Sequence, residues 1–299
     1  MEIKKHQNYL IIANEFLSRD NYPRALIFFK KAYDFALTAK EKTDALYEMA
    51  DIYLVLDQYR KAQTIYQKII EINDQEPGAY YGLSLTNEFL EGNIEDSILN
   101  YKKAIAVDPN YDRAYYYLGH LYDKVGETEK AKKCFEECLK LDPYDYVTYN
   151  DLGAIYESEN QLDMALELVA QSLTIHPNYG RALFNMGVIH KSRKDSNLAL
   201  AYYTKAIGEF DSPYLFLNMS AIYIEQKQYH KAIEILNRGL EDFEDSVNLH
   251  YNKACCFNIL GRKEEAIQEL RQAILIEPNA LSWAETDPDL KDITKEILW

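Results

Sequence analysis

Residues 112–145 are the stretch that most constrains how this chain can fold. Apolar residues recur there at intervals of three and four, in two successive runs. This spacing places the apolar side chains on one face of a helix and does not fit the alternation of a strand. Gly126 can end the first run in a left-handed conformation, and Pro143 ends the second because it has no N–H to donate. The stretch therefore predicts a helical hairpin.

The same residue classes return along the chain, so the hairpin is a repeating unit. In residues 112–145, the small residues Gly119 and Ala131 face each other and allow the two helices to approach closely. Comparable sets follow with little change toward the C-terminus and with more irregularity toward the N-terminus. The predicted repeats span residues 6–42, 43–76, 77–111, 112–145, 146–179, 180–212, 213–246 and 247–280.

Three repeats depart from the regular length. The first repeat has extra residues between Tyr33 and Lys42, which should lengthen its second helix, and Pro23 falls where that helix would begin. The repeat 77–111 needs one extra residue, which we expect in its first helix. The repeat 180–212 is about one residue short and lacks the closing proline.

The repeated set resembles the tetratricopeptide repeat (TPR), whose signature recurs at about 34 residues. In residues 112–145 the matching residues are Tyr115, Leu118, Gly119, Tyr122, Ala131, Phe135 and Pro143. The resemblance implies an all-α fold, a right-handed TPR superhelix built as an α-solenoid of helix-turn-helix repeats, and we expect a single domain over residues 1–299. It also implies that the first helices line a concave face and the second helices cover the outside.

The tail does not follow the repeat. We expect a capping helix over residues 286–299, with Thr286 or Asp287 as its N-cap and Pro288 in its first turn. Its apolar stripe would cover the open end of the last repeat, which has no following neighbour. The alternative is that the stripe docks a partner or a second copy of the chain. The stripe consists of Leu290, Ile293, Ile297 and Leu298.

Charge and apolar content narrow the class of partner. The net charge of −15 disfavours nucleic acid, because binding its phosphates relies on Lys and Arg. The N-terminal residues contain no long apolar run, so we expect neither a signal peptide nor a membrane span. The four cysteines have no spacing typical of a secreted disulfide framework, which favours a cytoplasmic protein.

No residue pattern predicts catalysis, a cofactor or a metal. Cys134 and Cys138 lie four apart, but a zinc site would need two further ligands, and no matching pair of His or Cys exists. We expect these two thiols to be buried structural residues, and His190 and His250 to be packing residues. The sequence contains no glycine-rich phosphate loop and no nucleophile motif. We therefore expect a non-enzymatic protein without a cofactor.

The residues that line the expected groove can be read from the repeat register. Two positions before the small residue of the first helix, successive repeats carry Tyr117, Asp151, Asn185, Asn218 and Asn252. A carboxamide can both donate to and accept from a peptide backbone, so stacked asparagines can hold an extended chain without reading its sequence. The run resembles the asparagine ladder of some TPR superhelices. Solvent contact of these asparagines is the alternative.

Further lining residues lie close by in the repeats. Arg113 and Arg181 are expected near the groove edge, where they could engage an acidic segment, and His120 on the lining face. TPR domains that grip the C-terminal carboxylate of Hsp70 or Hsp90 need Lys and Asn at set lining positions. Here the first repeat offers Leu10 and Asn14 and the next offers Glu48, so we expect no binding to Hsp70 or Hsp90 tails.

The sequence thus predicts a protein–protein interaction scaffold or adaptor that binds an extended peptide or partner segment in its concave groove. A peptide-responsive regulatory receptor within a multiprotein complex is the alternative, and a nucleic-acid-binding helical repeat is a weaker one. The identity of the protein partner stays open, and a second copy of the chain, giving a homo-oligomer, is among the candidates.

Overall fold

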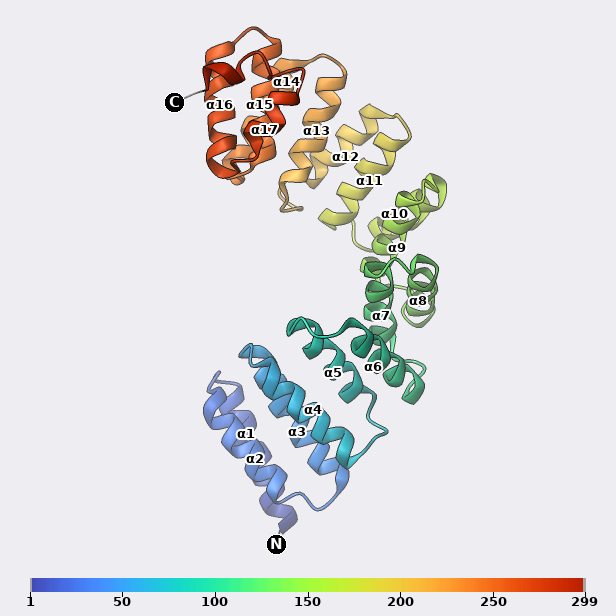
Figure 1. The fold of residues 1–299 in the computed structure, drawn as a ribbon. Helices are drawn as coiled ribbons and strands as arrows, with labels where there is room; N and C mark the ends of the chain where they lie inside the picture. The colour runs from blue at the N-terminus through green and yellow to red at the C-terminus, as the bar shows by residue number, and fades with distance from the viewer. Residues whose placement is uncertain (1, 298–299) are drawn as a thin grey trace. The chain divides into compact units, whose positions relative to one another are not determined.

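A computed structural model describes residues 2–297, and helices joined by short turns make up this part of the chain (Figure 1). No strand occurs within these residues. Helices α1 to α16 pair in order as helical hairpins, which confirms the predicted all-α solenoid of helix-turn-helix repeats. Across the described residues, no helix has both the length and the apolar character needed to cross a membrane.

The chain divides into two compact units, residues 1–144 and residues 145–299, which we call the N-terminal and the C-terminal unit. The division falls between the fourth and fifth repeats. A single solenoid domain over residues 1–299 stays a prediction, and each unit is described by itself.

The N-terminal unit contains four hairpins in which each helix packs on the next. Close packing comes from small residues, as at Gly119, where an added Cβ would lie 2.8 Å from a ring carbon of Phe135. The helices are α1 (Glu2–Leu17), α2 (Tyr22–Asp34), α3 (Ala39–Val55), α4 (Tyr59–Ile72), α5 (Pro77–Phe89), α6 (Ile94–Val107), α7 (Asp112–Lys124) and α8 (Thr128–Leu141).

Two length irregularities in this unit are placed differently from the prediction. The extra residues of the first repeat do not lengthen α2, which ends at Asp34, but extend α3 toward its N-terminus. The reason is a capping box, in which Thr38 Oγ1 accepts from the Glu41 N–H at 3.1 Å and the Glu41 carboxylate accepts from the Thr38 N–H at 3.1 Å. Pro23 does lie in the first turn of α2, as predicted.

The extra residue of the third repeat was predicted in its first helix, and this was wrong. Helix α5 has 13 residues, the same length as α7. The additional residue lies in the turn that joins α5 to α6, where Asn93 caps α6 by accepting from the Glu95 N–H at 2.7 Å. A cap in the turn starts the second helix later without disturbing the first.

The C-terminal unit continues the hairpins and ends in a short tail. Helix α12 has 11 residues against 14 in α10 and α14, so the sixth repeat is shorter, as predicted. The elements are α9 (Tyr146–Ser158), α10 (Leu162–Ile175), α11 (Gly180–Ser192), α12 (Ser196–Ala206), α13 (Pro213–Glu225), α14 (Tyr229–Asp242), α15 (Val247–Ile259), α16 (Lys263–Ile276), α17 (Ala280–Thr286) and the 3₁₀-helix η1 (Thr294–Glu296).

The tail differs from the predicted helix over residues 286–299. A helix ends, rather than begins, at Thr286, because Asp287 precedes Pro288 and takes an extended conformation. Turns and η1 follow. The predicted covering role of the stripe is nevertheless confirmed for its described members, since Leu290, Ile293 and Ile297 are at most 1% exposed and join the core of the last repeats. The fourth stripe residue, Leu298, lies outside the described residues.

Candidate partner-binding surfaces

The first helices of the C-terminal unit carry the predicted row of polar side chains. Helix α9 contacts α11, and α13 contacts α15, so the first helices of neighbouring repeats lie against each other in these pairs. The row has one residue from each helix, and each is partly exposed rather than buried. Its members are Asp151, Asn185, Asn218 and Asn252.

Two members of the row are joined through Asn150, a residue that the repeat pattern does not single out. Asn185 donates from Nδ2 to Asn150 Oδ1 at 2.9 Å, and Asn150 donates from Nδ2 to Asp151 Oδ1 at 3.0 Å. Asn150 is fully buried. The signal was a polar residue at a position where α11 carries Phe184 and α13 carries Leu217. Asn185 keeps one N–H and its oxygen for other partners.

The side chains of the other two asparagines form no hydrogen bond within the described part of the chain. The side chains of Asn218 and Asn252 are half-buried, and neither forms a hydrogen bond to any of residues 2–297. Helices α13 and α15 hold them at equivalent positions of adjacent repeats. Each carboxamide therefore has two donor hydrogens and an acceptor oxygen available.

The matching position in the N-terminal unit has different chemistry. Tyr117 lies in an aromatic group, with ring centroids 5.7 Å from Tyr81, 6.1 Å from Tyr101 and 5.2 Å from Tyr116. Tyr81 also meets Tyr111 edge-on at 5.5 Å. Burial is the main reason that the pKa of both Tyr81 and Tyr101 is raised above the ordinary value. These phenols therefore act as neutral hydrogen-bonding groups.

His120 lies beside this aromatic group and packs edge-on against two rings, at 4.5 Å from the Tyr116 centroid and 5.1 Å from the Phe135 centroid. Its side chain is partly exposed, but its Nε2 atom is buried. A ligand could therefore reach only part of the imidazole.

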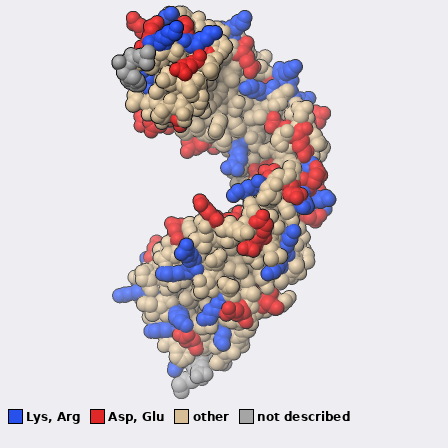
Figure 2. All heavy atoms as spheres, viewed as in Figure 1, with Lys and Arg blue, Asp and Glu red and all other residues tan. Residues whose placement is uncertain are grey.

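The two predicted arginines are exposed and belong to different units. Arg113 lowers the pKa of the neighbouring Tyr111, although burial outweighs it and the net shift is upward. Arg181 acts in the same way on Tyr179. Figure 2 shows Lys and Arg interspersed with Asp and Glu on the visible face of both units. Both guanidinium groups are thus exposed, and each lies beside a tyrosine of its own unit.

Two of the cysteines and one of the two histidines lie in the packed positions that the sequence predicts. Cys134 and Cys138 are buried, as predicted, and burial raises the pKa of the Cys134 thiol to about 11. Among the described residues, no group of His, Cys, Asp and Glu is arranged to hold a metal ion. His190 stacks on Tyr202, with 5.4 Å between ring centroids, as expected of a packing residue. His250 instead forms an ion pair with Glu269.

Tetratricopeptide repeat family models match most of the chain. The matched ranges are residues 44–74, 87–126, 112–145, 134–167, 180–209, 214–241 and 247–280. The chain belongs to the tetratricopeptide repeat family, and this family membership makes it a protein-interaction scaffold in the broad sense. No curated protein matches the sequence.

Solved structures agree on the fold. A tetratricopeptide repeat protein from Parabacteroides merdae ATCC 43184 has a TM-score of 0.62 at 16% identity, covering 86% of this chain and 97% of that chain. The Cut9–Hcn1 hetero-tetramer of the APC/C has a TM-score of 0.61 at 17% identity, and the match covers 97% of this chain but only 55% of the other chain. PilF of Pseudomonas aeruginosa has a TM-score of 0.60 at 17% identity, and the match covers 75% of this chain and 98% of that chain.

Proposed function

We propose that this protein is a non-enzymatic scaffold that binds an extended polypeptide segment through Asn185, Asn218 and Asn252. The observation that carries the proposal is the state of Asn218 and Asn252, which are half-buried without a hydrogen-bond partner among residues 2–297. A carboxamide that is held on a helix and only partly solvated gains most from a ligand that offers both a donor and an acceptor. A peptide backbone offers both at regular intervals.

The charged and aromatic neighbours would then supply preference for particular side chains. In the C-terminal unit, Asp151 favours a basic residue in the bound segment, and the exposed Arg181 favours an acidic residue there. In the N-terminal unit, Tyr117, Arg113 and His120 form a separate contact region that suits apolar or aromatic side chains. A cytoplasmic location and a protein partner are part of this proposal.

Selection from a random peptide library displayed on phage, followed by fluorescence polarisation with the selected peptide, tests the asparagine row. Replacing Asn185, Asn218 and Asn252 together by Ala should weaken binding about tenfold or more, since a net hydrogen bond contributes about 0.5–1.5 kcal/mol. Removing Asn218 and Asn252 alone should change the free energy of unfolding by less than about 0.5 kcal/mol, because they support no other residue.

A matched control removes amides from the opposite helices of the same unit. Gln171, Asn197 and Asn237 are exposed residues of α10, α12 and α14, and replacing all three by Ala should leave the peptide affinity unchanged. Equal affinity of the asparagine triple variant and the wild type, with circular dichroism showing an intact helical fold, would refute the proposal.

A further inference from the structure

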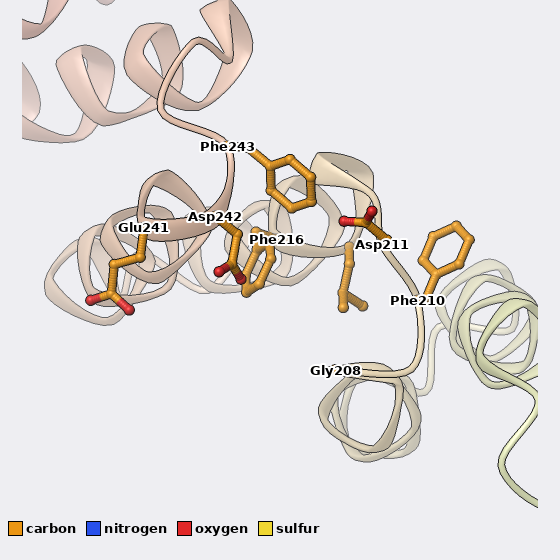
Figure 3. A pocket seen from close by; sticks show the side chains of 8 residues that line it. Gly208, Phe210, Asp211, Phe216, Glu241, Asp242 and Phe243 are labelled. Atoms are coloured by element: carbon orange, nitrogen blue, oxygen red, sulfur yellow. The ribbon is translucent and has the colours of Figure 1, made fainter.

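A cavity of about 530 Å³ lies in the C-terminal unit, between the connection that follows α12 and the last turn of α14 (Figure 3). Its size falls within the range of about 300–1,000 Å³ that small-ligand sites occupy. Three aromatic rings and three carboxylates dominate its lining. They are Phe210, Phe216, Phe243, Asp211, Glu241 and Asp242.

The cavity arises where the sixth repeat departs from the regular length. Helix α12 stops after 11 residues, against 14 in α10, and packs less closely on α13 than α10 does on α11. Gly208, an exposed residue, then turns the chain with a φ of +86°, a conformation that other residues rarely adopt. The connection from α12 to α13 is therefore longer than the one from α10 to α11, and its residues Gly208, Phe210 and Asp211 line the cavity.

The apolar wall of the cavity is held in place by the core. Phe216 is 3% exposed, and its ring centroid lies 6.2 Å from that of Phe243. On the other side, Phe210 stacks on Phe184 with 4.6 Å between centroids. The rings therefore need little rearrangement to receive a ligand, which lowers the entropic cost of binding.

The charges around the cavity are all of one sign. Asp211 comes from the connection after α12, whereas Glu241 and Asp242 come from the end of α14 (Figure 3). None of the residues that line the cavity is cationic, and the three carboxylates form no ion pair with the described residues. The carboxyl end of a helix favours cations, yet α14 has two carboxylates and no basic residue in its last turn. A cation in the cavity would therefore be attracted by carboxylates from two separate segments.

We propose that this cavity binds the side chain of an arginine or lysine from a partner polypeptide. The aliphatic stem of that side chain packs against Phe216 and Phe243, and its charged group meets the carboxylates of Asp211 and Asp242. The inference rests on the proposed function in one respect, that the ligand is a polypeptide. It adds a preference for one side chain, whereas the asparagine row recognises the backbone.

Titration of the isotope-labelled full chain with short peptides, followed through the backbone amide signals of Gly208, Asp211 and Phe243, tests the proposal. The probe is the capped hexapeptide Gly-Ser-Gly-Arg-Ser-Gly, compared with versions that carry Lys, Gln or norleucine in place of Arg. We expect saturable shifts at these three amides with Arg and Lys, and at least fivefold weaker binding with Gln or norleucine.

Two variants with the same change in charge separate this site from general attraction to an acidic surface. The variant Asp211→Asn, Glu241→Gln, Asp242→Asn should bind the Arg peptide at least fivefold more weakly than the wild type. The control variant Glu167→Gln, Glu234→Gln, Glu285→Gln removes three exposed carboxylates elsewhere in the unit and should bind like the wild type.

Equal weakening in the two charge variants, or equal binding of the Arg and norleucine peptides, would overturn the cavity as a basic side-chain site. The variant Asn185→Ala, Asn218→Ala, Asn252→Ala keeps the preference for Arg over Gln if the cavity is correct, even if the asparagine row has no function. Conversely, loss of the Arg preference alone leaves the backbone-binding proposal standing.

Discussion

The N-terminal and C-terminal units use the same helical hairpin but present different chemistry at the same repeat position. In the fourth repeat this position holds Tyr117, surrounded by other tyrosines, whereas the following repeats hold Asp151 and then asparagines. The hairpin is built from local backbone hydrogen bonds and from small residues between the helices, neither of which involves the side chain at this position. Partner chemistry can therefore change from repeat to repeat without changing the fold.

The contrast extends to buried polar groups. Tyr101 and Tyr203 occupy equivalent positions of second helices, in α6 and α12, and both are fully buried. Tyr101 donates from its hydroxyl to Glu88 Oε1 at 2.6 Å, while the hydroxyl of Tyr203 has no hydrogen-bond partner among residues 2–297. One unit thus satisfies a buried phenol that the other leaves unsatisfied.

The largest expected effect tests whether the two units lose stability separately. Phe135 in the N-terminal unit is 1% exposed. Phe135→Ala should lower the free energy of unfolding by about 3–5 kcal/mol, because it leaves a cavity beside Gly119. In a solenoid, each repeat contacts only its neighbours, so amide hydrogen exchange should accelerate in α5–α8 while α14–α16 stay protected.

The corresponding variant in the C-terminal unit is Leu236→Ala, at a fully buried residue of α14. It should lower the free energy of unfolding by about 2–5 kcal/mol. Exchange should then accelerate in α13–α16 and stay slow in α3–α6. Uniform acceleration over the whole chain in either variant would show that the two units unfold as one.

The next effect concerns the two buried tyrosines. Tyr101→Phe should destabilise the protein by about 1.5–3 kcal/mol, because the partly buried Glu88 carboxylate loses its hydrogen bond. Tyr203→Phe should be neutral or stabilising, since it removes a buried hydroxyl without a partner. Denaturant unfolding of both variants measures this difference, and equal losses of stability would contradict it.

The smallest effect depends on pH and belongs to the C-terminal unit. His250 Nδ1 lies 2.7 Å from Glu269 Oε2, and Nε2 lies 3.0 Å from the carbonyl oxygen of Glu244. Both partners are acceptors, so the ring satisfies both only when it carries two protons. The hydrogen bond to Glu269 raises the pKa of His250, against the lowering effects of burial and of Lys253.

The pKa of His250 is higher in the folded state than in the unfolded state. Its contribution to the free energy of unfolding is therefore complete below the unfolded-state pKa of about 6.5 and is lost as pH rises through the folded-state pKa. Over this pH range, we expect the free energy of unfolding of the wild type to fall by about 1 kcal/mol relative to that of His250→Gln. Denaturant unfolding at several pH values measures the difference, and identical pH profiles of the two proteins would rule the effect out.

Much of the fold could be predicted from local pattern. The spacing of apolar residues predicts the helices of the repeats, α1 to α16, but not α17; Pro23 predicts the start of α2, and the small residues at 119 and 131 predict close packing. The repeat register predicts which residues share one position of the first helices, because equivalent residues in a repeat array occupy equivalent helix positions, but their role as groove-lining residues stays a prediction. The hydrogen bond between Asn150 and Asn185 did not follow, since it joins residues of two different repeats.

The repeat and its register can be read from the chain alone, because helical hydrogen bonds and apolar spacing act over a few residues. The capping box at Thr38 and the helix end before Pro288 are also local signals, although the repeat pattern alone did not predict them. The structure was needed for contacts between repeats: the hydrogen bond between Asn150 and Asn185, the burial of Leu290, Ile293 and Ile297 on the last repeats, and the cavity beside Gly208. These features depend on how side chains of separate repeats meet and on how the space between them is filled, and neither is encoded in a short window of sequence.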